Sequence, residues 1–185
     1  MKIKNSTDQY GLVSIILHWF FVILIFSMAG IGFYMVSLDY YDPLYRSLPN
    51  LHKSIGILLI GLLIFRLMWR WYNIKPTPVN GSKTWEIKLA HLVHYLMYLL
   101  IFLIGVSGYL ISTADGRSIA VFNLFNIPAV TLNIENQEDK AGLIHLWLVF
   151  ILLATIAIHL IGALKHHFIN KDITLTRMLT TRRKS

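Results

Sequence analysis

The sequence predicts an all-α integral membrane protein, a bundle of four transmembrane helices with both termini in the cytoplasm. Three observations predict it. Four apolar runs are long enough to cross a bilayer, whose hydrocarbon core needs about 20 helical residues. Apolar residues make up 56% of the 185 residues and charged residues only 14%, well below the roughly one quarter usual in soluble proteins. Lysines and arginines are also divided unequally between the segments that separate the runs.

The four runs form a single predicted domain that covers residues 1–185. The predicted spans are 12–38, 55–72, 85–111 and 143–164. Pro43 and Pro49 lie in the polar segment after the first run, and Pro76 and Pro78 break the second run from the third. The first run is far longer than the apolar core of a cleaved signal peptide, about 7–15 residues. We therefore expect the first span to be retained.

The orientation follows from the cations. Thirteen of the seventeen lysines and arginines fall on one side of the predicted membrane. They are Lys2, Lys4, Arg66, Arg70, Lys75, Lys83, Lys88, Lys165, Lys171, Arg177, Arg182, Arg183 and Lys184. The opposite side has four cations and six of the nine acids. Because cytoplasmic loops are rich in lysine and arginine, the sequence predicts that both termini and the segment between the second and third runs are cytoplasmic. The cations lie between and after the apolar runs and are not gathered on a soluble face. This placement indicates that the chain contacts the lipid bilayer and has no nucleic-acid partner.

The chain has no cysteine and eight histidines. The absence of cysteine excludes disulfides, thiolate zinc sites, iron–sulfur clusters and covalent attachment of a c-type haem. Metal chemistry in this chain would therefore depend on histidine. An ionisable residue inside a span is costly, and it is a functional candidate for that reason.

Two histidines share one face of the fourth span. His145 and His159 are fourteen residues apart, which is nearly four helical turns or about 21 Å along the axis. A haem with two histidine ligands takes one imidazole on each side of the porphyrin, so this helix offers one ligand to each of two haems. At the periplasmic level the remaining histidine is His52, which gives the pair His52 and His145 by elimination.

At the cytoplasmic level His159 has more than one candidate partner. His18 and His94 lie at a suitable depth, and His91 is nearer the rim. The alternative for any one of these histidines is a polar side chain that is hydrogen-bonded to a neighbouring helix. Matched depths on different helices favour ligation of haem.

Several segments of the chain resemble the bacterial cytochrome b561 family, and the resemblance extends from about Tyr10 to Met178. The segments are His18-Trp19, Leu51 to Gly56, Arg66 with Arg70, Leu89 to His94, Gly105 to Tyr109, and His145 to His159 followed by Leu164 to Phe168. The resemblance implies a four-helix, multi-pass cytochrome of the bacterial inner membrane with two haems b. It implies that His18 and His159 ligate the cytoplasmic haem, and that His52 and His145 ligate the periplasmic haem.

The resemblance also implies electron transfer between an unidentified periplasmic donor and the quinone pool, with ubiquinone as the expected acceptor. One family member is a superoxide oxidase, so a superoxide:quinone oxidoreductase is a candidate activity for this chain. Lys53 and Arg117 are candidates to contact a small anion or a haem propionate. His94, His166 and Arg70 are candidates to contact a quinone or the haem edge.

Two other classes of function fit the four spans. One is a cytochrome b anchor subunit of a larger membrane dehydrogenase. The other is a haem-free transporter that uses its histidines as a relay.

Overall fold

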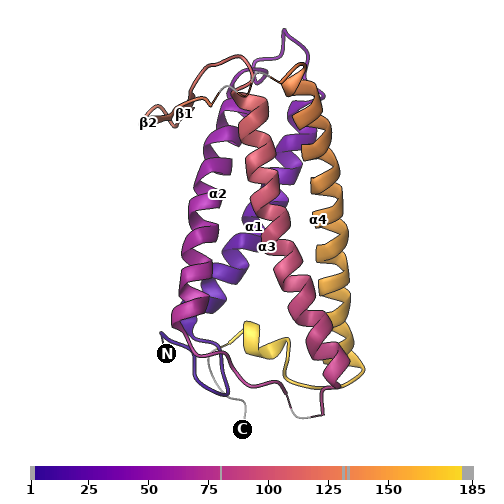
Figure 1. Cartoon of the computed structure of the whole chain (residues 1–185). Helices are drawn as coiled ribbons and strands as arrows, with labels where there is room; N and C mark the ends of the chain where they lie inside the picture. The colour runs from indigo at the N-terminus through magenta and orange to yellow at the C-terminus, as the bar shows by residue number, and fades with distance from the viewer. Residues whose placement is uncertain (1–2, 80, 131, 133, 181–185) are drawn as a thin grey trace. The chain divides into compact units, whose positions relative to one another are not determined.

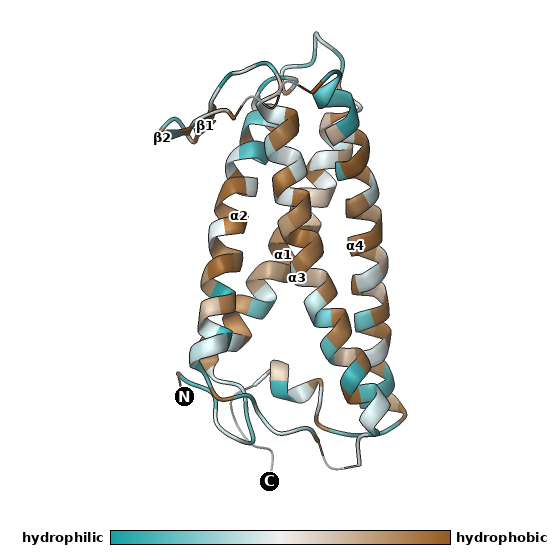
Figure 2. Ribbon diagram, in the orientation of Figure 1, coloured by the Kyte–Doolittle hydropathy of each residue, from teal (hydrophilic) through white to brown (hydrophobic). Residues whose placement is uncertain are grey.

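The computed structural model describes residues 3–79, 81–130, 132 and 134–180. It has four long helices: α1 (Leu12–Met35), α2 (Ser47–Tyr72), α3 (Thr84–Ser112) and α4 (Gln137–Phe168) (Figure 1). Each is long and apolar enough to cross a membrane, and apolar residues follow each helix for most of its length (Figure 2). The predicted fold class, an all-α four-helix membrane protein, is confirmed. Four of the cations used to predict the orientation, Lys2, Arg182, Arg183 and Lys184, lie outside the described residues.

α1 begins at Leu12 and α2 ends at Tyr72, as predicted, but the other helix ends differ from those of the predicted spans. α2 begins at Ser47, eight residues before the predicted span, and includes Pro49; proline is tolerated in the first turn because the first amides of a helix have no acceptor within it. α4 begins at Gln137, with Glu138 and Asp139 in its first turn, where negative charge opposes the helix dipole favourably. Hydropathy therefore marks the lipid-embedded part of each helix, and capping and charge determine where the helix begins.

The chain forms two compact units, and each contains a stretch of every long helix. Unit 1 consists of Met1–Ile23, Ile64–Tyr98 and Leu153–Ser185, and unit 2 consists of Leu24–Leu63 and Leu99–Leu152. Neither unit is a continuous stretch of sequence. Of the described lysines and arginines, nine belong to unit 1 and four to unit 2.

Unit 1 contains the segment that follows α4, and hydrogen bonds attach this segment to other parts of the unit. The indole Nε1 of Trp19 donates to the carbonyl oxygen of Met178 at 2.7 Å. Met178 ends the short 3-10 helix η1 (Thr176–Met178), drawn in yellow in Figure 1. Arg177 Nη1 donates to the carbonyl oxygen of Thr77 at 2.7 Å. These bonds hold the segment after α4 against α1 and the α2–α3 connection.

Unit 2 contains a hairpin that the sequence did not predict. β1 (Ile119–Val121) pairs with β2 (Phe125–Ile127) in antiparallel register. The turn places Phe122 and Asn123 at positive φ, 48° and 56°, a conformation that is common for asparagine and costly for phenylalanine. The amide of Phe122 donates to Ser54 Oγ on α2 at 3.1 Å. Val121 is fully buried, so the hairpin is packed onto unit 2.

Candidate functional site

The first candidate site lies in unit 2 and contains His52 of α2 and His145 of α4. Their ring centres are 6.3 Å apart and their planes are inclined by 68°. His145 Nδ1 lies 3.0 Å from the carbonyl oxygen of Ile104 and 3.1 Å from Ser107 Oγ. A carbonyl oxygen only accepts hydrogen bonds, so the proton of His145 belongs on Nδ1, and Nε2 is left with a free lone pair. This is the arrangement that orients metal-bound histidines.

Two glycines on neighbouring helices make room for these rings. A Cβ at Gly32 of α1 would lie 3.3 Å from His52 Cε1, and a Cβ at Gly108 of α3 would lie 3.2 Å from His145 Cε1. Both distances are shorter than ordinary carbon–carbon contact, about 3.5–4.0 Å. Each glycine therefore allows an imidazole to lie directly against the backbone of the next helix.

The second candidate site lies in unit 1, where the structure brings together His18 of α1, His94 of α3 and His159 of α4. The ring centres of His18 and His159 are 6.3 Å apart. Those of His94 and His159 are only 4.9 Å apart. His91, the rim candidate, is exposed.

The two separations of 6.3 Å fit a metal ion held between two imidazoles. A metal–imidazole bond is about 2 Å long and a ring nitrogen lies about 1 Å from the ring centre, so two imidazoles on opposite sides of one metal have centres about 6 Å apart. The 4.9 Å between His94 and His159 is too short for this arrangement. Among the described residues, no group of three or more His, Asp or Glu side chains is placed to hold a metal ion. Each pair thus offers two ligands, the number that a b-type haem needs in addition to its porphyrin nitrogens.

Arg66 of α2 lies beside the second pair. Its Nη2 is 3.4 Å from His18 Nδ1, and its guanidinium lies over the ring of Phe21 at 5.0 Å and that of Tyr98 at 5.9 Å. Its Nη1 is buried and has no hydrogen-bond partner among the described residues. The environment of His18 therefore differs from that of His145, since a cation faces one ring and a carbonyl oxygen faces the other.

The two anion-binding candidates of unit 2 differ in their surroundings. Lys53 follows His52 on α2 and is half-buried. Arg117 is exposed, and its Nη2 lies 2.5 Å from Asp115 Oδ2. Hydrogen bonds from Arg117 hold the pKa of Asp115 below its usual value, and those bonds raise the pKa of Arg117. Asp115 thus already neutralises Arg117, which leaves Lys53 as the better candidate for contact with an anion.

The candidates for contact with a quinone all lie in unit 1. Arg70 lies 5.9 Å from the ring centre of Tyr98, one turn along α2 from Arg66. His166 Nδ1 lies 2.6 Å from Asp172 Oδ2. Burial alone would raise the pKa of Asp172, but hydrogen bonds from Thr174 and His166 outweigh it and hold that pKa below its usual value. His94 thus lies with the histidine pair, whereas His166 is engaged with the segment that follows α4.

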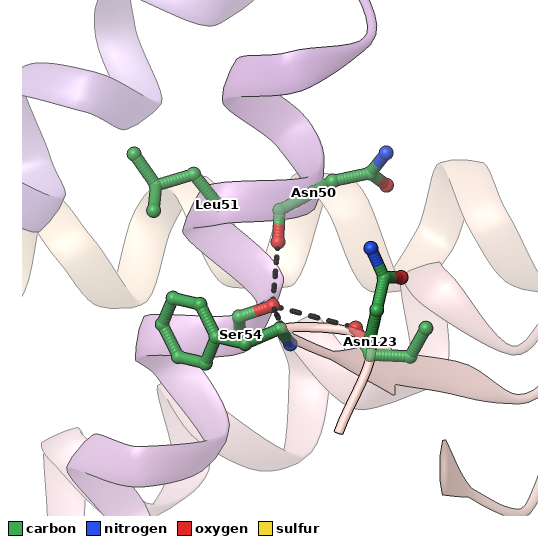
Figure 3. A pocket seen from close by; sticks show the side chains of 6 residues that line it. Asn50, Leu51, Ser54 and Asn123 are labelled. Carbon is green, nitrogen blue, oxygen red and sulfur yellow. Dashed lines mark hydrogen bonds between the residues drawn. The ribbon is translucent and has the colours of Figure 1, made fainter. Parts of the chain in front are cut away.

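A small cavity of about 260 Å³ lies between the start of α2 and the hairpin (Figure 3). Its lining is Asn50, Leu51, Ser54, Ala120, Phe122 and Asn123. Ser54 Oγ donates to the carbonyl oxygen of Asn50 at 2.9 Å. The cavity does not include His52, so it is separate from the histidine pair of unit 2.

Several neighbours of the histidines were not singled out from the sequence as contacts. Ser107 was visible only as part of the segment Gly105 to Tyr109. Arg66 was visible as a cation near the end of the second run and, with Arg70, as part of the family resemblance. Asp172 lies beyond the predicted spans. The one available signal was Arg66 itself, because an arginine inside an apolar run is a functional candidate.

The chain resembles known proteins over nearly its whole length. A model of the family described as prokaryotic cytochrome b561 matches residues 9–181. Cytochrome b561 homolog 2 of Escherichia coli (strain K12) is 44% identical over 179 residues, which are 97% of this chain and 95% of that protein. The probable superoxide oxidase CybB of Yersinia pestis is 28% identical over 95% of this chain and 98% of its own length. Cytochrome b561 homolog 1 of Escherichia coli (strain K12) is 26% identical over 95% and 99%.

Proposed function

We propose that this chain, which belongs to the prokaryotic cytochrome b561 family, is a di-haem cytochrome that carries electrons from a periplasmic donor to the quinone pool. Membership of the family makes it a membrane cytochrome b that functions in electron transfer. The number of haems, their ligands, the orientation, the donor and the acceptor are the parts that we propose.

One observation carries the proposal: two histidine pairs with the same separation, 6.3 Å, one in each unit. His52 and His145 would hold the haem on the periplasmic side, and His18 and His159 would hold the haem on the cytoplasmic side. Two histidine ligands leave no open position on the iron, which favours electron transfer over oxygen binding. The bound haem supplies a one-electron carrier at each pair.

The residues of this chain orient the ligands and shield the sites. Ser107 and the carbonyl of Ile104 fix the His145 ring, as the outer partners of metal-bound histidines do. The glycines at 32 and 108 let the two rings of unit 2 lie close to neighbouring backbone. The helices exclude water, which limits the reorganisation that accompanies a change of charge.

Superoxide is our candidate for the donor. One relative is named a probable superoxide oxidase, and Lys53 follows His52 in the sequence with its positive charge available for an anion. Two superoxide ions would each lose one electron and leave as dioxygen, and one quinone would take these two electrons and two protons to become a quinol. His94 and Arg70 are the proposed polar contacts of the quinone head, and the pair of His166 and Asp172 is the proposed source of protons.

The spectrum of purified protein tests the proposal. We expect a reduced α-band typical of haem b and about two haems per chain. His52→Ala and His18→Ala should each lose one haem and keep the other, whereas His91→Ala should keep both. A colourless protein would support a haem-free transporter, and full haem content in both ligand variants would refute the pairing.

A second measurement tests the donor. Purified protein in detergent, with a soluble ubiquinone analogue and a steady source of superoxide, should form quinol faster than a matched sample without protein. Lys53→Gln should slow that reaction, and Arg117→Gln should slow it less because Asp115 already neutralises Arg117. A protein with two haems and no such activity would instead fit an anchor subunit that receives electrons from a partner.

A further inference from the structure

We propose that Arg66 raises the reduction potential of the haem held by His18 and His159, so that an electron shared between the two haems rests at this site. The inference rests on the proposed function, because it takes the two histidine pairs as haem ligands. It adds the residue that sets the order of the two potentials, and with it the direction of electron flow.

The first step is the position of the cation. Arg66 lies six residues before Tyr72, the last residue of α2. Arginines near helix ends in membranes usually extend towards the interface and keep their charge in water. Arg66 instead contacts Phe21 of α1 and Tyr98 of α3, so its guanidinium faces the interior of unit 1.

The second step is that this charge is not neutralised by a described side chain. The ion pairs found among the described residues join Arg117 to Asp115, Lys165 to Glu86 and His166 to Asp172. None involves Arg66, and its buried Nη1 has no partner among the described residues. In a site of low permittivity such a charge acts strongly on its neighbours.

The third step is the contrast between the ligand environments. His145 directs Nδ1 at the carbonyl oxygen of Ile104, which increases the basicity of the ring and favours oxidised iron. If Nε2 of His18 faces the iron, its Nδ1 carries the ring proton and finds no acceptor in Arg66, whose Nη2 lies 3.4 Å away and can only donate. The ring is then less basic than that of His145, and the nearby positive charge favours the form of the iron with one more electron. The two effects have opposite signs, so the pair in unit 1 should have the higher potential.

A redox titration of the α-band tests this ordering in the purified holoprotein. Wild type should titrate in two one-electron steps. His52→Ala, which keeps only the haem of unit 1, should titrate at the higher of the two wild-type potentials. If the haem that remains in His52→Ala titrates at the lower potential, the inference is overturned, and no Arg66 variant is needed for this test.

Variants of Arg66 test the cause. The upper component is the titration step with the higher reduction potential, and the lower component is the other step. Arg66→Gln should make the reduced form of the upper component at least about tenfold less favoured, which is a fall in its reduction potential of about 59 mV for one electron. The reduction potential of the lower component should not change. Arg66→Lys keeps the charge and should shift the upper component by less than half as much. Arg70→Gln removes the same charge one turn away and should also shift it less.

Three outcomes would refute the role of Arg66. They are an unchanged upper component in Arg66→Gln, a change confined to the lower component, and equal shifts in Arg66→Gln and Arg66→Lys. The haem content of wild type separates this failure from a failure of the proposed function. A wild-type protein without two haems contradicts the function, whereas two haems with no response to Arg66→Gln contradict only this inference.

Discussion

Gly108→Ala should loosen the haem that we propose His52 and His145 hold, because the new methyl group would push against the His145 ring. The methyl carbon would lie 3.2 Å from His145 Cε1 and 3.4 Å from its Nδ1. Ordinary contact requires about 3.5–4.0 Å, so the ring must withdraw by roughly half an ångström. A metal site tolerates only about 0.2 Å in its bond lengths, and the displaced ring must stretch or tilt the bond.

The expected cost is that of moderate overpacking, about 1–3 kcal/mol. Since about 1.4 kcal/mol is a factor of ten in affinity, the haem should be held roughly 5- to 150-fold more weakly. Gly32→Ala should act in the same way on the other ligand, with its methyl 3.3 Å from His52 Cε1. The assay is the rate of haem transfer from purified protein to an excess of apomyoglobin, followed in the visible spectrum.

Two matched glycines provide the controls. A Cβ at Gly30, on α1 with Gly32, or at Gly142, on α4 with His145, would have nothing within 4 Å. Alanine at either position makes the same change of helix propensity without contact to a ligand. Haem loss from Gly108→Ala and Gly32→Ala at the rate of the two controls would refute the reasoning that these glycines accommodate the ligands.

Three further predictions concern packing and pH. Gly105→Ala should destabilise unit 2 by about 1–3 kcal/mol, because its methyl group would overlap the Ile60 side chain. The double variant with Ile60→Ala should have a higher melting temperature, followed by circular dichroism, than Gly105→Ala alone. An equal melting temperature in the two variants would contradict the overlap. Trp19→Phe removes the hydrogen bond to the carbonyl oxygen of Met178, which contributes about 1 kcal/mol. Amide hydrogen exchange in η1 should therefore be faster in Trp19→Phe, and it should be unchanged in the control variant Trp147→Phe. The pKa of Asp172 is held below its usual value in the folded protein. Ionised Asp172 therefore stabilises the segment after α4 fully when the pH is above the pKa of the unfolded state, about 3.9. This stabilisation is lost as the pH falls through the lower pKa of the folded state. Exchange at Thr174 should therefore rise only in that acid range, while Asp172→Asn should show fast exchange throughout.

The number and approximate place of the helices could be predicted because hydropathy and helix length are local properties of the chain. That His52 and His145 lie close together could be predicted as well, since residue number along a helix fixes depth and few histidines were available. The rotation of each helix about its own axis could not be predicted from the sequence. It determines that Arg66 faces His18 and that Gly108 faces His145, and it depends on the packing of all neighbouring side chains together.

The hairpin shows a second limit of prediction from the sequence. Its strands have three residues each, too short to give a clear alternation of apolar and polar residues. Its turn uses Phe122 at positive φ, where local preference would favour glycine or asparagine. Burial of Val121 and the hydrogen bond to Ser54 stabilise this conformation, and both involve contacts distant in sequence.

The position of Arg66 inside an apolar helix needs an explanation of its own. Removing a cation from water costs several kcal/mol, and contacts with the Phe21 and Tyr98 rings recover only part of it. The Nη1 of Arg66 also has no acceptor among the residues that the structure describes. A neutral side chain at position 66 would pack at lower cost, so stability alone does not explain the arginine. The proposed effect on the imidazole that it faces would explain it, because a fixed charge beside a haem held by His18 would alter the reduced and oxidised states unequally, whereas packing would act on both alike.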